Sequence, residues 1–180
     1  MGTSMLLGFL IAIVLGLYSG KNKNGILDKI TSLFCYVGIS IPTFWFGIML
    51  IYLFSVHLHI LPSIGMHSDG NRSFGDLVLH MMMPCAVLTF ANASQYIRYL
   101  RSSTITEMSS DYVMVQKAYG MKEAGILFRH VLKNAMLPMI TVLGMSLQSL
   151  VSGAIITEQV FAWPGIGQLA VTAVMQFDYP

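Results

Sequence analysis

Charged residues are scarce in this sequence: Asp, Glu, Lys and Arg make up 10% of its 180 residues, while 55% are hydrophobic. A soluble domain has about 25% charged residues. Four stretches contain no charged residue at all: 1–20, 30–68, 77–97 and 134–157. Each is long enough for the ~20 residues with which a helix crosses a bilayer. Because lipid cannot hydrogen-bond the backbone, such segments must be helical, and the sequence predicts an all-α, polytopic membrane protein.

Signatures of enzymes are also missing. The sequence has no G-x-x-x-x-G-K-[ST] phosphate loop, no H-E-x-x-H zinc motif and no G-x-S-x-G nucleophile elbow. The two cysteines, Cys35 and Cys85, lie in uncharged stretches, which favours small core residues over a disulfide or a metal site. The histidines between residues 57 and 80 could meet a soft metal ion, but they lack fixed ligand spacing. We therefore expect no enzyme, no bound metal and no cofactor.

The basic residues are distributed asymmetrically among the loops between the uncharged stretches. Three lie between the first and second stretches and six between the third and fourth, but only Arg72 lies between the second and third. With four spans, the first and third loops share one side of the membrane, which holds nine of the ten basic residues. The positive-inside rule makes that side cytoplasmic. The charge layout thus indicates topology and not an anionic partner such as nucleic acid.

We expect a single domain over residues 1–180 with four transmembrane helices. Their expected bounds are about 3–20, 33–56, 78–98 and 134–157, with a cytoplasmic loop over about 102–130. This topology places the N-terminus outside without a signal peptide, so we expect a missing upstream span or an unusual insertion. After residue 157, Trp163-Pro164-Gly165 interrupts an uncharged segment and predicts an external turn followed by a short interfacial helix.

Small residues and prolines mark the expected spans. The first span has a small residue at every fourth position: Gly8, Ala12, Gly16 and Gly20. This spacing places them on one helix face and favours close packing against a neighbouring helix. Each later span contains one proline, which removes a backbone donor and predicts a kink of the kind that suits helices rearranging around a pathway. These prolines are Pro42, Pro84 and Pro138.

Polar side chains inside the spans are uncharged. Six of them are candidates to line a pathway: Asn92, Gln95, Thr141, Gln148, Ser149 and Ser152. Such side chains face the bundle interior, where they either hydrogen-bond helices together or border a polar route, and the sequence favours neither alternative. Proton- or voltage-driven transport usually needs ionisable groups inside the membrane. Since the uncharged stretches have none, we expect the energy for any transport to come from another subunit.

The loop before the last span reads QKAYGMKEAGILFRH over residues 116–130 and is both charged and helix-forming. Its apolar side chains can fill a groove on a partner protein, and its charged ones can fix orientation at the rim. Gly120 permits a turn with positive φ. The alternative is an amphipathic helix on the membrane surface, where Lys122 and Arg129 meet anionic lipid. The residues alone do not decide between these two interpretations.

The chain contains several further motifs: GISIPTFWFGIMLI at residues 38–51, Asp111–Val113, Lys117–Gly120, Leu127–His130, Lys133–Pro138, Glu158, Val160-Phe161 and Trp163-Pro-Gly-Ile-Gly167, closing on Asp178–Pro180. Together they resemble the permease subunits of bacterial ABC importers for dipeptides and oligopeptides. The resemblance covers nearly the whole chain, and the motifs keep the family's order and spacing.

The chain departs from the family pattern in two places and in length. The general ABC permease loop begins Glu-Ala-Ala, where this chain has Met114, Val115 and Gln116, a change that fits the peptide subfamily. Tyr119 stands where a basic residue is expected. Family members usually have six helices, so the chain is similar to a four-span portion of a permease that is truncated at both ends.

The resemblance implies the fold of a type I ABC importer permease in a bacterial cell membrane. It implies a pathway for peptides formed with a second permease subunit, cytoplasmic ATP-binding subunits, and an external solute-binding protein. It also implies a coupling segment that docks on the ATPase, comprising Tyr112, Val115, Lys117, Ala118, Tyr119, Gly120, Met121, Lys122 and Glu123. Two alternatives remain: a permease for nickel or metal chelates, and a non-transporting remnant or assembly partner.

Overall fold

The computed structural model describes residues 1–68, 70 and 72–177, and the side chains of all of these except 151 and 152. The chain divides into two compact units. Unit 1 comprises residues 1–5, 41–91 and 147–180, and unit 2 comprises residues 6–40 and 92–146.

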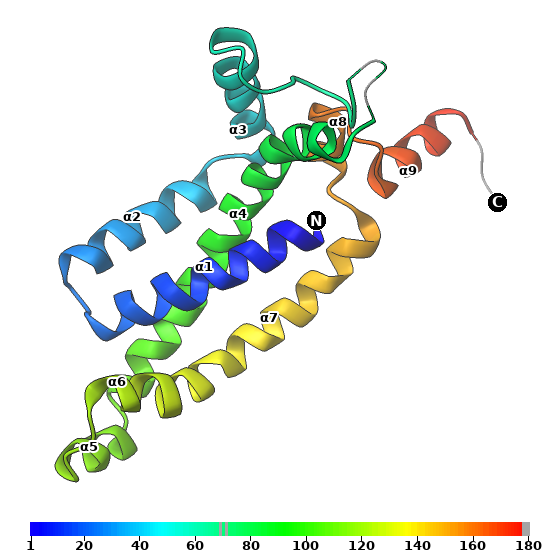
Figure 1. Cartoon of the computed structure of the whole chain (residues 1–180). Coiled ribbons are helices and arrows are strands. Elements are labelled where there is room, and N and C mark those ends of the chain that lie inside the picture. The colour runs from blue at the N-terminus through cyan, green and yellow to red at the C-terminus, as the bar shows by residue number, and fades with distance from the viewer. Residues whose placement is uncertain (69, 71, 178–180) are drawn as a thin grey trace. The chain divides into compact units, whose positions relative to one another are not determined.

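Every secondary-structure element of the described residues is a helix, which confirms the all-α prediction (Figure 1). In chain order these are α1 (Gly2–Lys21), α2 (Ile26–Ser40), α3 (Thr43–Leu50), the π-helix η1 (Ile51–His57), α4 (Phe74–Met108), α5 (Asp111–Ala118), α6 (Glu123–Gly125), the π-helix η2 (Ile126–Val131), α7 (Leu132–Ser152), α8 (Ile155–Val160) and α9 (Ile166–Met175). Helices α1, α4 and α7 contribute residues to both units.

Unit 2 is built on the close approach of α1 to α4 (Figure 1). Gly8 lies against Ala93, and Gly20 lies against Thr104, whose Cβ would be only 2.6 Å from a Cβ on Gly20. Both glycines are buried. The expected small-residue packing face is therefore confirmed. Because the partner number rises with the glycine number, α1 and α4 run in the same direction, as the first and third spans of the expected topology must.

The loop between α4 and α7 contributes to the same core. Val113 of α5 and Ile126, Leu127 and Val131 of η2 are fully buried in a cluster with residues of α1 and α4. Phe128 projects from the other side of η2 and meets Tyr18 of α1 edge-on, with ring centroids 6.1 Å apart. The loop between α4 and α7 is thus a folded part of unit 2.

Unit 1 has a smaller apolar core around Phe161. Met83 and Val87 of α4 are buried with it, and side chains of α3, η1 and α8 pack around them. Gly47 lets α3 approach this cluster, since a Cβ there would lie 3.1 Å from the Phe161 ring. The Phe161 carbonyl also accepts the backbone N–H of Gly65 at 2.8 Å, which ties the loop after η1 to the core.

The expected helix over 33–56 is broken and not merely kinked. Helix α2 ends at Ser40, and α3 begins at Thr43 with Pro42 in extended conformation as its N-cap residue. A proline ring disfavours helical geometry in the residue before it, and its fixed φ is well suited to a helix start. Pro42 therefore ends one helix and starts another, whereas Pro84 and Pro138 lie inside the continuous helices α4 and α7.

The expected helix over 134–157 also ends earlier. Helix α7 stops at Ser152, Gly153 takes a φ of +76°, and α8 begins at Ile155. A glycine in the left-handed region is a common helix terminator. The turn and short helix expected after residue 157 are present, because Trp163-Pro164-Gly165 separates α8 from α9.

Three helices of the described chain are long and apolar enough to cross a membrane: Gly2–Lys21, Phe74–Met108 and Glu123–Leu150. The pair Ile26–Ser40 and Thr43–His57 makes a fourth if its two halves form one broken span. By length and composition, these helices can supply the four expected spans.

Replacing Gly20 with valine is expected to destabilise unit 2, because the added side chain would collide with Thr104. Overpacking of this kind costs about 1–3 kcal/mol. Thermal unfolding of the purified protein in detergent measures the loss as a lower Tm. Gly144→Val is the matched control, since a Cβ at this helical glycine meets nothing within 4 Å. Equal effects of the two substitutions would contradict close packing at Gly20.

Candidate functional site

The segment between α4 and α7 forms the candidate site. Ser109 and Ser110 turn the chain after α4, α5 follows, and a second turn leads from Tyr119 into α6 and η2. Val113 is the residue of α5 that is buried in the unit 2 core. One side of this short helix is thus fixed, and its other sides are available to a partner.

Tyr112 lies at the base of the segment and not on its free side. Its ring packs against the core cluster, and its hydroxyl donates a hydrogen bond to the Glu107 carboxylate at 2.7 Å. Burial and this hydrogen bond raise the pKa of Tyr112. Of the residues expected in the coupling segment, Tyr112 is therefore placed to hold α5 in position.

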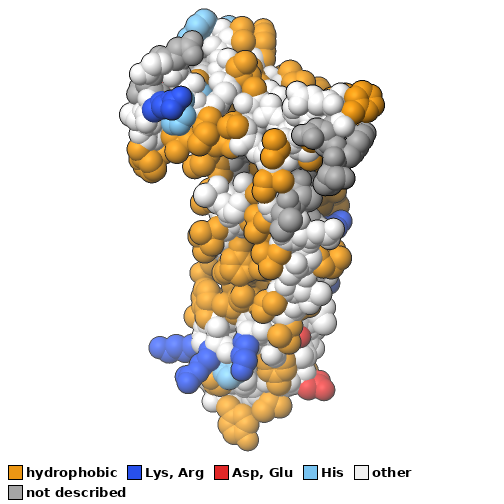
Figure 2. Space-filling model, turned by 90° about the vertical axis from the view of Figure 1, so that its right-hand side faces the viewer, with side chains coloured by type: hydrophobic (Ala, Val, Ile, Leu, Met, Phe, Trp, Pro, Cys, Tyr) orange, Lys and Arg blue, Asp and Glu red, His pale blue; other side chains and the backbone are white. Residues whose placement is uncertain are grey.

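The free side of the segment carries an apolar surface, which we call the docking surface: Met114, Val115, Tyr119 and Met121. Their exposed fractions are 68% for Met114, 53% for Val115, 85% for Tyr119 and 40% for Met121. Lys117, Ala118, Lys122 and Glu123 are exposed beside them. In Figure 2, Lys and Arg side chains gather at the lower end of the view beside exposed hydrophobic side chains.

Met114 was missed as a member of the docking surface. Its signal is visible in the sequence, because Met114 and Ala118 are four residues apart on a helix, as are Val115 and Tyr119, and residues at this spacing share a face. In the comparison with the family pattern, Met114 stands where Glu-Ala-Ala begins, and that position alone does not show its exposure.

Gly120 makes the turn that follows α5, and its φ of +76° confirms the expected positive value. The N–H of Gly120 donates to the Lys117 carbonyl at 3.0 Å, and the N–H of Met121 donates to the Gln116 carbonyl at 3.1 Å. These bonds close the C-terminal end of α5. The turn fixes the position of Tyr119 and Met121 relative to the helix.

Two ion pairs, from the first turn of α2 and from the end of α1, join helices of unit 2. Arg101 of α4 binds both carboxylate oxygens of the buried Asp28, and the Nη2–Oδ2 distance is 2.8 Å. Oδ2 also accepts the backbone N–H of Asn24. Asp28 precedes the expected span 33–56, and the Arg101 guanidinium holds its pKa below the usual value. Lys21, at the end of α1, pairs with Glu123 at 2.8 Å and so joins α1 to the start of α6.

The candidate pathway residues are distributed over both units. Asn92, Gln95 and Thr141 belong to unit 2, and Gln148, Ser149 and Ser152 belong to unit 1. Asn92 is half-buried against Gly8, while Gln95 is exposed. The Thr141 hydroxyl is exposed and donates to the Leu137 carbonyl of its own helix. The side chain of Ser152 lies outside the described residues, and the pathway role of all six remains a prediction.

Asp76 organises the loop that precedes α4 in unit 1. Its carboxylate accepts hydrogen bonds from the backbone N–H of Ser68 at 2.8 Å and from the Ser68 hydroxyl at 2.7 Å. His67 Nδ1 lies 3.3 Å from the same carboxylate. The bonds from Ser68 lower the pKa of Asp76. The His80 ring is buried, and its Nδ1 lies 2.9 Å from the Asp76 carbonyl. Within the described part of the chain, no three His, Cys, Asp or Glu side chains are placed to hold a metal ion.

The surroundings of the Glu158 carboxylate are apparent only in the structure. Glu158 is only 9% exposed. Its Oε1 accepts the N–H of Ala154 at 3.1 Å, and its Oε2 accepts the N–H of Gln168 at 3.0 Å. Three glycines leave room for the carboxylate, since a Cβ on any of them would lie less than 3 Å from it: Gly153, Gly165 and Gly167. Glu158 therefore joins the N-terminal ends of α8 and α9.

Comparison with known proteins adds a family and several relatives. Residues 12–180 match the family described as binding-protein-dependent transport system inner membrane component. The chain is 37% identical to the oligopeptide transport system permease protein AppB of Bacillus subtilis, over 98% of this chain and 56% of the relative. It is 32% identical to the dipeptide transport system permease protein DppB of Escherichia coli, over 98% of this chain and 59% of the relative. The chain thus spans little more than half the length of these relatives.

Replacing Asp28 with asparagine is expected to lower the Tm of the purified protein, because it leaves the Arg101 charge half-buried without its partner. A hydrogen bond to a charged group contributes about 1.5–3 kcal/mol. Thermal unfolding in detergent measures the loss. Lys21→Gln, which breaks the more exposed pair with Glu123, is the control and is expected to have a much smaller effect.

The same pair predicts how stability depends on pH. Folding lowers the pKa of Asp28 below its ordinary value of 3.8. The stabilisation is therefore present above pH 3.8 and is lost as the pH falls through the lower, folded-state pKa. The difference in Tm between wild type and Asp28→Asn is expected to shrink only in that acidic range. A difference that vanishes near neutral pH would contradict the pairing.

Proposed function

Because the chain belongs to the family of binding-protein-dependent transport system inner membrane components, we propose that it supplies the membrane-spanning part of an ATP-driven peptide importer. The relatives named for oligopeptide and dipeptide transport support peptides as the cargo. A further relative, 36% identical over 98% of this chain, is a probable D,D-dipeptide transport system permease protein, DdpB of Escherichia coli. In this proposal the chain works with a second permease subunit, cytoplasmic ATP-binding subunits and an external solute-binding protein.

The docking proposal rests on one observation. The docking surface is exposed, while the segment that carries it is anchored by side chains buried in the core. A membrane chain hides apolar side chains in lipid, but the charge asymmetry puts this segment on the cytoplasmic side. An apolar side chain as exposed as Tyr119, next to Met114 and Val115, therefore favours a protein partner. Lys117, Lys122 and Glu123 form a charged rim around it, which is the usual anatomy of an interface.

The contacts of the segment support its use in coupling. Val113 of α5 packs in the same core as α1 and α4, and η2 leads without interruption into α7. The Lys21–Glu123 pair adds a link to the end of α1. A partner that moves the docking surface would therefore move the ends of three helices of unit 2 with it. This is the role we assign to closure of the ATPase subunits upon ATP binding.

Charged substitutions on the docking surface are expected to abolish co-purification of the ATPase subunits. In the double variant Val115→Asp and Tyr119→Asp, two carboxylates would enter an apolar interface, and burying an unpaired charge is strongly unfavourable. Insertion into the membrane should persist, because neither side chain supports the core. The measurement is ATPase recovery with the affinity-purified, co-expressed permease.

Phe74→Asp is the matched control, because Phe74 is an equally exposed aromatic residue, 79% exposed, but lies at the opposite, external end of α4. This variant should retain the ATPase. If the double variant retains it as well and uptake is unchanged, the docking assignment is wrong.

Uptake by the assembled transporter tests the cargo. Vesicles that contain the complex are expected to accumulate a labelled dipeptide when ATP is present and not when it is replaced by ADP. Labelled nickel should not accumulate above the level of empty vesicles. Nickel accumulation without dipeptide accumulation would replace peptide by metal as the cargo. ATPase binding without any uptake would instead favour the non-transporting assembly partner.

A further inference from the structure

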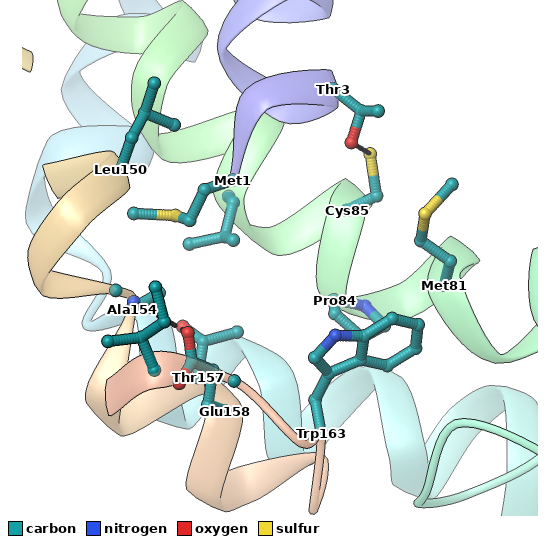
Figure 3. A pocket seen from close by; sticks show the side chains of 14 residues that line it. Met1, Thr3, Met81, Pro84, Cys85, Leu150, Ala154, Thr157, Glu158 and Trp163 are labelled. Atoms are coloured by element: carbon teal, nitrogen blue, oxygen red, sulfur yellow. Dashed lines mark hydrogen bonds between the residues drawn. The ribbon is translucent and has the colours of Figure 1, made fainter. Parts of the chain in front are cut away.

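Unit 1 contains a half-enclosed cavity of ≈ 220 Å³ that the coupling role does not use (Figure 3). Its wall is mostly apolar and comes from the start of α1, from α4 and from the segment around α8. Concave, mostly apolar spaces with a few placed polar groups are the usual form of small-molecule sites. The volume is below the range of about 300–1,000 Å³ for drug-sized ligands, so it suits one end of a longer molecule.

Among the side chains that line this cavity, Glu158 is the one that carries a carboxylate. The described residues place no Lys, Arg or His within ion-pair distance of its carboxylate. Each carboxylate oxygen accepts one backbone N–H. Since an ionised carboxylate has about four acceptor sites, two sites remain for a ligand that donates hydrogen bonds.

The surroundings fix the carboxylate in place. The N–H groups that bind it belong to Ala154, the N-cap residue of α8, and to Gln168 in the first turn of α9. Helix N-termini favour negative charge. Gly165 and Gly167 approach so closely that no side chain fits between backbone and carboxylate. The negative charge is therefore preorganised and does not have to be oriented by a ligand.

The indole of Trp163 borders the same cavity, and Figure 3 shows it projecting from the segment that follows Glu158. The backbone N–H of Trp163 donates to the Glu158 carbonyl at 2.8 Å, so the two residues are held next to each other. The face of a tryptophan ring attracts cations, including organic ammonium groups. A carboxylate and an indole together select an ammonium and disfavour an anion.

We infer that this cavity binds the terminal ammonium group of a peptide, with Glu158 accepting its hydrogen bonds and Trp163 contacting its charge. The inference rests on the proposed peptide transport and names the part of the cargo that the chain recognises. The first residue of the peptide occupies the apolar part of the cavity, beside Leu88 and Leu150. The remainder of the peptide extends beyond it.

Tryptophan fluorescence provides a direct test, because the chain has two tryptophans. Trp45 lies on α3 and does not line the cavity. In a Trp45→Phe background, Trp163 is the sole reporter. The purified permease in lipid nanodiscs, without ATPase or binding protein, is titrated with trialanine and with N-acetyl-trialanine, which lacks the ammonium. Trialanine is expected to change the emission and to bind at least about tenfold more tightly, since a hydrogen bond between charged groups is lost on acetylation.

Two variants in the same background test the assignment to Glu158. Glu158→Gln removes the charge and is expected to abolish the preference for trialanine. Thr3→Val changes another lining residue without altering charge and should keep it. If Glu158→Gln does not fold, the comparison of the two peptides on the parent protein still decides. Equal affinities for both peptides, no change of emission with either, or an unchanged preference in folded Glu158→Gln overturns the inference.

The binding test is separate from the test of transport. If the complex takes up dipeptide but trialanine leaves the Trp163 emission unchanged, the cavity assignment is wrong and the proposed function stands. A permease that binds trialanine in preference to its acetylated form, but supports no ATP-dependent uptake, keeps the cavity and contradicts the transport proposal.

Discussion

Unit 2 depends on how closely α1 approaches α4. The missing side chains at Gly8 and Gly20 allow the backbone of α1 to lie against Ala93 and Thr104. This register determines which loop groups meet beyond the ends of the helices. With α1 in place, Lys21 reaches Glu123, and Asp28 in the first turn of α2 reaches Arg101. In lipid, where apolar side chains gain nothing from leaving the solvent, contact of this kind is the main source of helix association.

The buried carboxylates of the described chain share one feature: each accepts hydrogen bonds from groups that lie beside it in the folded structure. Asp28 has Arg101 and the Asn24 N–H, Asp76 has Ser68, and Glu158 has two helix N-termini. The consequences differ. The first joins α2 to α4 in unit 2, the second shapes the loop before α4 in unit 1, and the third leaves acceptor capacity facing a cavity. Burial without such partners would cost several kcal/mol for each charge.

The sequence predicts features that depend on local chemistry. Helix α1 at Gly2–Lys21 nearly equals the expected 3–20, and Gly120 has the expected positive φ. The helix breaks at Pro42 and Gly153 were harder to predict, because each lies within an uninterrupted apolar stretch. The composition of such a stretch predicts a transmembrane helix. The pairing of Asp28 with Arg101 lies beyond local reasoning, since 73 residues separate the two. Likewise, the glycines around Glu158 are seen to leave room for its carboxylate only when the folded chain brings them together.

The docking surface has one more consequence, which concerns the order of assembly. Helix α5 and its closing turn are already formed in the isolated chain, with Val113 buried beneath them. A partner therefore binds a surface that is already folded, and the loss of conformational entropy on association is small. Subunits that join in this way need not fold together or be synthesised together. In the proposed importer, an ATP-binding subunit could therefore be exchanged for another copy while the docking surface stays folded.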